Sequence, residues 1–94
     1  MKNYAVYLEG ADFLLPRGDK KELLGFFVTV RVEAESDLAA RVAAQTLVES
    51  DPELTGAFRE QGIAPKLTVK VVHELLPDNR MSKTPYMYFP MEEP

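Results

Sequence analysis

His73 is the only histidine in the chain, and it stands next to Glu74. An imidazole beside a carboxylate can act as a general acid or base near neutral pH. Apolar and polar residues alternate around this pair, however, and successive side chains of a strand point to opposite faces of a sheet. We therefore expect His73 at the margin of the core, away from Glu74 and without a catalytic role. A metal site would need further ligands that a single histidine does not supply.

Three carboxylates, those of Glu33, Glu35 and Asp37, crowd the junction between a strand pattern and a helix pattern. Carboxylates can bind a hard cation, but this spacing is not that of an EF-hand loop, and acidic residues at a helix start stabilise its dipole. Ser36 between them is expected to cap the helix, because no base for a nucleophilic serine is implied beside it. The five glycines are isolated and form no phosphate-binding loop. The sequence therefore predicts no catalytic residue, no metal site and no cofactor.

The remaining candidates share one face of a predicted sheet, which no helix is left to cover. On this uncovered sheet face we expect Ala5, Tyr7, Glu9, Phe27, Thr29, Arg31, Thr68, Lys70 and Val72. Aromatic rings amid threonine and basic groups can stack on RNA bases, but the basic aromatic motif of an RNA recognition module is missing. Aromatic residues with arginine also suit a protein interface, whereas the competing interpretation is a half-polar face in water. We take as candidate binding residues Tyr7, Phe27, Thr29, Arg31, Lys70 and Val72.

The clearest structural pattern runs from residue 24 to residue 49. Every second residue over 24–34 is apolar, which predicts a strand with one face on the core. After the cap, we expect a helix over residues 37–49. Its solvated stripe should consist of Arg41, Gln45 and Glu49, which recur every fourth residue. Its buried side should consist of Ala39, Ala40, Val42, Ala43 and Leu47.

A shorter alternation over residues 4–9 predicts a first strand, and we expect a bulge at Gly10. The segment 16–21 is rich in turn residues and joins this strand to the next one. The two strands are therefore expected to form an antiparallel hairpin.

The second half of the chain repeats these signals. Pro52 suits the first position of a second helix, which we expect to end near residue 61, before Gly62. Alternation over residues 66–76 predicts a third strand. The apolar tail 86–89 lies between two prolines, which predicts a short edge strand on this chain. The alternative is that the tail extends the sheet of a partner by strand addition.

A hairpin followed by two helices and a strand predicts the topology of the sheet. If the crossover is right-handed, the third strand lies antiparallel beside the first, in the spatial order two, one, three. The predicted fold class is α+β, half of a ferredoxin-like sandwich, with both helices on one face and the tail as a C-terminal edge strand. Since 94 residues have room for one core, we predict a single domain over 1–94.

Composition limits the partners and the compartment. Hydrophobic residues make up 46% and charged residues 28%, as in ordinary globular proteins. The net charge is −4 and the basic residues are spread along the chain, so nucleic acid and anionic membranes are poor partners. We see no cysteine, no signal peptide and no membrane-length apolar stretch. We therefore expect a cytoplasmic protein without a membrane partner.

Four motifs carry a resemblance to known proteins, namely YAVYLEG at 4–10, GFF at 25–27, VEAE at 32–35 and DPEL at 51–54. With them the chain resembles, over most of its length, small stand-alone bacterial proteins of unknown function. The topology is more loosely similar to that of dimeric ferredoxin-like proteins, which include cofactor-free oxygenases, isomerases and regulatory domains. In such enzymes the catalytic groups line the uncovered sheet face, whereas His73 is expected on the other face. The resemblance therefore implies no activity for this chain.

Two functions from different classes follow. The first is a binding or interaction protein, homodimeric through the uncovered sheet face or bound there to another protein. The second is a small cofactor-free dimeric enzyme of the dimeric α+β barrel type, with Tyr7, Arg31 or Lys70 lining a pocket. The two differ in what that face should carry, namely a flat apolar interface for the first and a closed polar pocket for the second.

Overall fold

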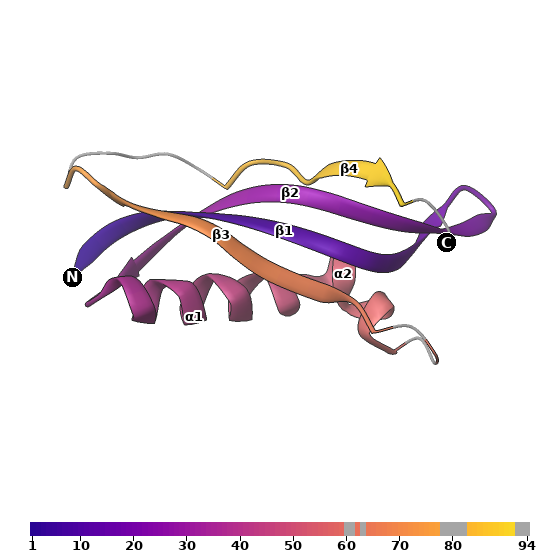
Figure 1. Cartoon of the computed structure of the whole chain (residues 1–94), viewed down its shortest axis with the longest axis horizontal. Helices are drawn as coiled ribbons and strands as arrows, with labels where there is room; N and C mark the ends of the chain where they lie inside the picture. Colours follow the sequence, from indigo (N-terminus) through magenta and orange to yellow (C-terminus); the bar gives the residue numbers. More distant parts are fainter. Residues whose placement is uncertain (60–61, 63, 78–82, 92–94) are drawn as a thin grey trace.

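The computed structural model describes residues 1–59, 62, 64–77 and 83–91. The chain forms a four-stranded antiparallel sheet with its helices packed against one face (Figure 1). The strands are β1 (Lys2–Arg17), β2 (Lys20–Ala34), β3 (Lys66–Leu75) and β4 (Met87–Pro90). The helices are α1 (Asp37–Glu49), α2 (Pro52–Thr55) and a 3-10 helix, η1 (Gly56–Arg59).

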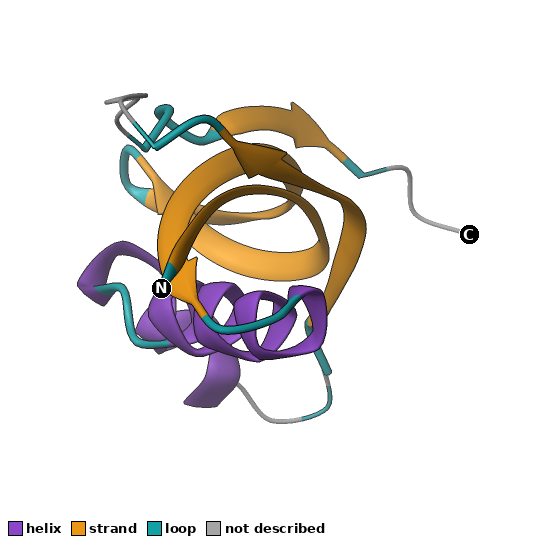
Figure 2. Cartoon of the chain, turned by 90° about the vertical axis from the view of Figure 1, so that its left-hand side faces the viewer, coloured by secondary structure: helices purple, strands orange, loops and turns teal. Residues whose placement is uncertain are grey.

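The strand order is β3-β1-β2-β4, so the predicted order of the first three strands is confirmed. The tail forms an edge strand on its own chain, where β4 pairs with residues 24–27 of β2. Seen end-on, α1 and α2 lie on the same side of the twisted sheet (Figure 2). The predicted α+β class, with helices on one face of an antiparallel sheet, is confirmed.

The hairpin is longer and its turn tighter than the sequence predicts. β1 and β2 pair without interruption from Phe13 and Leu24 to Arg17 and Lys20, so segment 16–21 is mostly strand. The turn itself needs only Gly18 and Asp19, because Gly18 adopts a φ of +67° that suits a tight hairpin. The predicted six-residue connection is therefore wrong.

A bulge interrupts β1 where it was expected, but the local geometry differs. The register between β1 and β2 shifts between Gly10 and Phe13, and the residue with positive φ is Asp12, at 62°. Gly10 is needed for a different reason: the Phe26 ring lies where a side chain on Gly10 would be. The small residue therefore lets a core ring pack against the backbone of the neighbouring strand.

A second bulge, in β3, changes which side chains face the helices. Tyr7 pairs with Val71 but Leu8 pairs with Val69, so Lys70 is an extra residue in the β1–β3 ladder. An extra residue shifts the alternation by one position beyond it. Val72 therefore packs against the core and His73 is exposed on the opposite face, so both sequence predictions for these side chains are wrong.

The core lies between the sheet and α1. Its largest fully buried side chains are Phe13, Phe26, Leu8, Leu24, Leu54, Val6, Val28, Val30 and Val48. Phe26 is central, because its ring packs edge-on against those of Phe13, Tyr86 and Tyr88, with centroid distances of 4.9, 5.1 and 6.1 Å. Edge-to-face aromatic pairs add to the stabilisation that burial of apolar surface provides. Tyr86 and Tyr88 therefore pack the C-terminal segment against the sheet.

The first helix begins as predicted but presents a different side to the sheet. The Ser36 hydroxyl accepts a hydrogen bond from the Ala39 amide at 3.2 Å, which confirms the cap. The buried residues are Ala40, Ala44 and Val48, which recur every fourth position. The predicted stripes were out of phase, since Val42 is 58% and Leu47 46% exposed.

The polar residues Arg41 and Gln45 flank the contact between α1 and the sheet and are only half exposed. Arg41 pairs with Asp37 at 2.8 Å, and Gln45 donates a hydrogen bond to the Leu67 carbonyl at 3.4 Å. These contacts allow polar groups to stand beside the buried stripe. Periodicity alone did not distinguish these flanking positions from a solvated stripe.

The second helix begins at Pro52, as predicted. Asp51 caps it by accepting a hydrogen bond from the Glu53 amide at 3.0 Å, and the α-helical turn changes to a 3-10 turn at Gly56. The expected end near residue 61 lies outside the described residues. Gly62 has a φ of +80°, the conformation that commonly follows the end of a helix.

Candidate functional site

The face of the sheet opposite the helices is here called the open face. Its central side chains are Ala5, Tyr7, Glu9, Phe27, Thr29, Arg31, Lys70, Val71, His73, Met87 and Phe89. Tyr7 and Phe27 stack with their ring centroids 5.7 Å apart and their planes 5° apart. The ring centroid of Phe27 in turn lies 5.2 Å from that of Phe89. Three strands therefore contribute one ring each to an aromatic row across the sheet.

The row depends on Gly25, which lies beneath Phe89. A side chain at Gly25 would overlap the Phe89 ring, so only glycine lets β4 lay this ring on the sheet. The sequence predicted the strand at 86–89 but not that alternate residues of it would serve opposite faces. Tyr86 and Tyr88 pack on the core, whereas Met87 and Phe89 join the open face.

A shallow apolar pocket of about 470 Å³ lies beside the aromatic row. It is lined by Tyr7, Phe27, Val28, Thr29, Thr84, Pro85 and Met87. Thr84 fixes the segment before β4 against the β2 edge: the Thr29 amide donates to its hydroxyl at 2.9 Å, and its own amide donates to the Thr29 carbonyl at 3.0 Å. The pocket is therefore built from two rigid segments of backbone, and Tyr7 is its only ionisable lining side chain among the described residues.

Charged side chains flank the row, and each is paired within the chain. Lys70 Nζ lies 3.3 Å from Glu9 Oε2, and Arg31 Nη2 lies 3.4 Å from Glu33 Oε1. Arg31 also donates a hydrogen bond to Asn3 at 3.1 Å, while its Nε is buried without an acceptor among the described residues. Partly exposed pairs of this kind contribute little to stability. Among the described residues, they leave the region around the rings without an unpaired charge.

Of the six predicted binding residues, five lie together on the open face. They are Tyr7, Phe27, Thr29, Arg31 and Lys70. The sixth, Val72, packs against the core because of the β3 bulge, and the correction brings His73 to the open face opposite Ala5. His73 and Arg31 stay outside the lining of the apolar pocket. The sequence did not point to Met87, Thr84 and Pro85, although the apolar tail was a signal for part of this set.

The carboxylates at the start of α1 do not gather into a site. Asp37 is paired with Arg41 at 2.8 Å, and Glu33 with Arg31 at 3.4 Å. Within the part of the chain that the structure describes, no group of three or more His, Asp or Glu side chains is placed to hold a metal ion. Ser36 acts as a helix cap, as expected.

On the helix side of the sheet, Asp51, Lys83 and Tyr86 form a polar cluster. The Tyr86 hydroxyl donates to Asp51 Oδ2 at 2.6 Å, and Lys83 lies 3.5 Å from the same oxygen and 4.1 Å from the centre of the Tyr86 ring. The hydrogen bond from Tyr86, helped by the Glu53 amide and Lys83, outweighs burial and holds the pKa of Asp51 below its usual value of 3.8. Burial and then the bond to Asp51 raise the pKa of Tyr86 above its usual 10.0.

A Tyr86→Phe variant should lower the free energy of unfolding at pH 7 by about 1.5–3 kcal/mol, because it removes a hydrogen bond to a charged group. The folded-state pKa of Asp51 is depressed, so its contribution is present above pH 3.8 and is lost as the pH falls through the folded-state value. The folded-state pKa of Tyr86 is raised, so its contribution is present below pH 10.0 and is lost as the pH rises above it. The difference from wild type should therefore shrink at both ends.

Urea unfolding at acidic, neutral and alkaline pH measures this effect. Tyr4→Phe is the matched control, since Tyr4 is 5% exposed and makes no side-chain hydrogen bond within the described residues. A loss in Tyr86→Phe that is the same at every pH, and no larger than that of the control, would contradict the role of the Tyr86–Asp51 bond.

Comparison with protein-family models, with curated proteins and with solved structures found no match to this chain. Over the described residues, none of the helices has the length and apolar character needed to cross a membrane.

Proposed function

We propose that the protein is a small interaction protein without enzymatic activity, which forms a homodimer through its open face. The aromatic row carries this proposal. Tyr7 and Met87 remain 36% and 64% exposed beside Phe27, next to the apolar pocket, although burial of such side chains is favourable. Aromatic residues, methionine and arginine together are the composition that marks the centre of protein interfaces.

A second copy of the chain is the partner that fits best. The molecule measures 43 × 24 × 21 Å, so its broad side can supply the ~800 Å² per partner that specific interfaces bury. Copies of a chain with a net charge of −4 repel each other, but the charges beside the rings are paired internally. Two open faces can therefore meet without placing like charges opposite one another. Ferredoxin-like proteins that dimerise through an uncovered sheet face provide the arrangement by analogy.

The chemistry of the pocket favours binding over catalysis. A cofactor-free enzyme needs an acid or base within hydrogen-bond reach of its substrate. Tyr7 is the one ionisable side chain among the described residues that line the pocket. The lining otherwise offers hydroxyls and apolar groups, which suit contact with a partner.

Light scattering coupled to size-exclusion chromatography tests the proposal. One chain has a mass of 10.6 kDa, and we expect about twice this mass at micromolar concentration. The mass should fall towards that of one chain only on dilution. A mass of one chain at all accessible concentrations would contradict the homodimer.

A further inference from the structure

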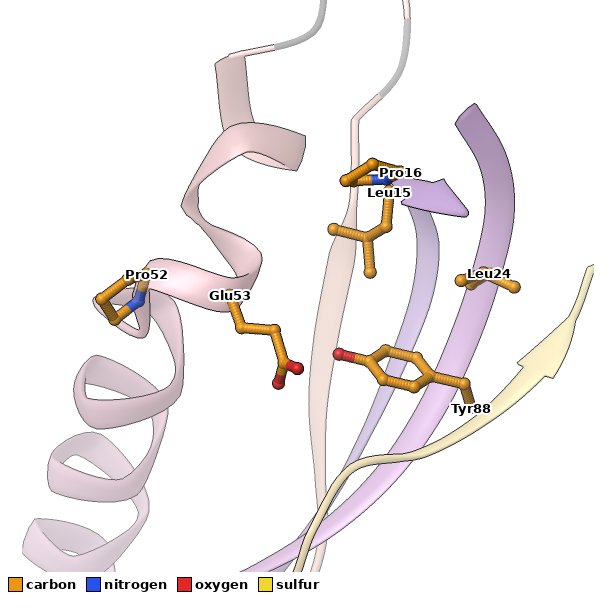
Figure 3. A pocket seen from close by; sticks show the side chains of 6 residues that line it. All are labelled: Leu15, Pro16, Leu24, Pro52, Glu53 and Tyr88. Atoms are coloured by element: carbon orange, nitrogen blue, oxygen red, sulfur yellow. The ribbon is translucent and has the colours of Figure 1, made fainter. Parts of the chain in front are cut away.

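A second pocket lies on the helix side of the sheet, near the closed end of the β1–β2 hairpin. It has a volume of about 400 Å³, within the range of pockets that bind small molecules. Its lining residues are Leu15, Pro16, Leu24, Pro52, Glu53 and Tyr88 (Figure 3). They come from β1, β2, β4 and α2, so distant parts of the sequence build the pocket together.

One end of this pocket is polar. The Glu53 carboxylate and the Tyr88 hydroxyl point toward one another across it (Figure 3). Burial, followed by the negative charge and hydrogen bond of Glu53, raises the pKa of Tyr88 above its usual 10.0. The phenol therefore stays protonated at neutral pH, and its hydroxyl can donate a hydrogen bond to the Glu53 carboxylate. Its oxygen can still accept a hydrogen bond, and so can the carboxylate oxygens.

Glu53 has no basic partner in the described part of the chain, in contrast to nearby Asp51. Asp51 is satisfied by Tyr86 at 2.6 Å and Lys83 at 3.5 Å. Among the described residues, the pocket therefore holds a carboxylate without a basic partner, opposite the Tyr88 hydroxyl, and such a carboxylate attracts a cation. The net charge of −4 favours the approach of a cation further.

The rest of the pocket lining is apolar. Leu15 and Leu24 are 5% and 2% exposed, and the rings of Pro16 and Pro52 complete the walls. These surfaces favour an alkyl or aryl group over a hydrated ion. A small inorganic cation would use the polar end alone and leave the apolar walls in contact with water.

We propose that this pocket binds a primary amine, with its ammonium group between Glu53 and Tyr88 and its apolar chain or ring against Leu15 and Leu24. The ammonium group can donate one hydrogen bond to the Glu53 carboxylate and another to the Tyr88 oxygen. The proposal is independent of the homodimer, because the pocket and the open face lie on opposite sides of the sheet.

An NMR titration of the complete chain with 2-phenylethylammonium tests the proposal. We expect saturable shifts at the amides of Leu24, Glu53 and Tyr88. The neutral analogue 2-phenylethanol should bind about tenfold more weakly or worse, because it cannot make a charge-assisted hydrogen bond to the carboxylate. Equal binding of the alcohol and the amine, or the lack of saturable shifts at these amides, would overturn the proposal.

Substitutions locate the ammonium group. Glu53→Gln should raise the dissociation constant of the amine about tenfold while leaving that of the alcohol unchanged. Glu49→Gln is the matched control, because Glu49 is an exposed glutamate at the end of α1 outside the pocket lining, and it should bind the amine as wild type does. Equal losses in the two variants would show general charge attraction and overturn the site, as would an unchanged constant in Glu53→Gln.

Discussion

A Phe26→Ala variant should lose about 3–5 kcal/mol of the free energy of unfolding, the range for removing a large aromatic side chain from a core. Phe26 is fully buried, and its ring packs on Phe13, Tyr86 and Tyr88. The substitution leaves a cavity that these neighbours cannot close, because the sheet fixes their backbones. It also removes the main contact of the two tyrosines of the C-terminal segment. Urea unfolding followed by far-UV circular dichroism measures the loss.

Phe26→Leu keeps the measurement informative if the alanine variant does not fold. Leucine fills most of the volume but lacks the edge-to-face contacts, so we expect a loss of about 1–2 kcal/mol. In both variants the amides of β4 should exchange with solvent faster than those of β1. A free energy of unfolding equal to that of wild type in Phe26→Leu, with β4 still protected in Phe26→Ala, would contradict the central place of Phe26.

A Phe27→Glu variant should retain the fold and lose the proposed dimer. Phe27 is the middle ring of the aromatic row, stacked between Tyr7 and Phe89. A carboxylate at the centre of a buried interface is left without a partner in either copy, and this costs several kcal/mol. We expect the dissociation constant of the dimer to rise about 100-fold or more, equivalent to ~3 kcal/mol. Sedimentation equilibrium measures this constant directly.

Leu38→Glu is the matched control for Phe27→Glu. Leu38 is 72% exposed on α1, so the same charge is introduced at an apolar residue on the other side of the molecule. We expect the dimer of this variant to be as tight as that of wild type. A dimer that survives Phe27→Glu and is lost in Leu38→Glu would place the interface on α1 and refute the role of the open face.

The sequence predicted the faces of the first two strands well, because alternation is unbroken over most of their length. In the second strand, the residues that alternate with Val28 were predicted to face the core, and those that alternate with Phe27 to face the uncovered side. The structure places both sets as predicted. The predicted side-chain orientations in the third strand were wrong beyond Lys70. An alternating pattern of valines and polar residues does not reveal that the strand contains one extra residue. The error exchanged Val72 and His73 between the two faces.

The prediction of which side of the first helix is buried was wrong for a related reason. Alanine and valine occur on both sides of α1, so apolar character alone did not select the buried stripe of Ala40, Ala44 and Val48. The helix approaches the sheet along the line that gives the closest packing of small side chains, which depends on the sheet beneath it. That surface is assembled from three strands and is not encoded in the helix sequence.

The two pockets could not be predicted from local patterns either. The pocket on the open face needs the segment of Thr84 and Pro85 to lie along β2, and the pocket on the helix side needs α2 to lie opposite Tyr88. Both arrangements join residues more than thirty positions apart in the chain, as the Tyr86–Asp51 bond also does. Only the apolar character of residues 86–89 signalled that the tail belonged to the fold.

Intermolecular contacts between labelled and unlabelled copies test the homodimer most directly. In an isotope-filtered NMR experiment on a mixed sample, we predict nuclear Overhauser effects from the rings of Tyr7 and Phe27 in one copy to the methyl groups of Thr29, Val71 and Met87 in the other. The methyl groups of Leu38 and Val42 should give none. Intermolecular effects confined to α1, or their complete absence in a sample that relaxes as a single chain, would contradict the account.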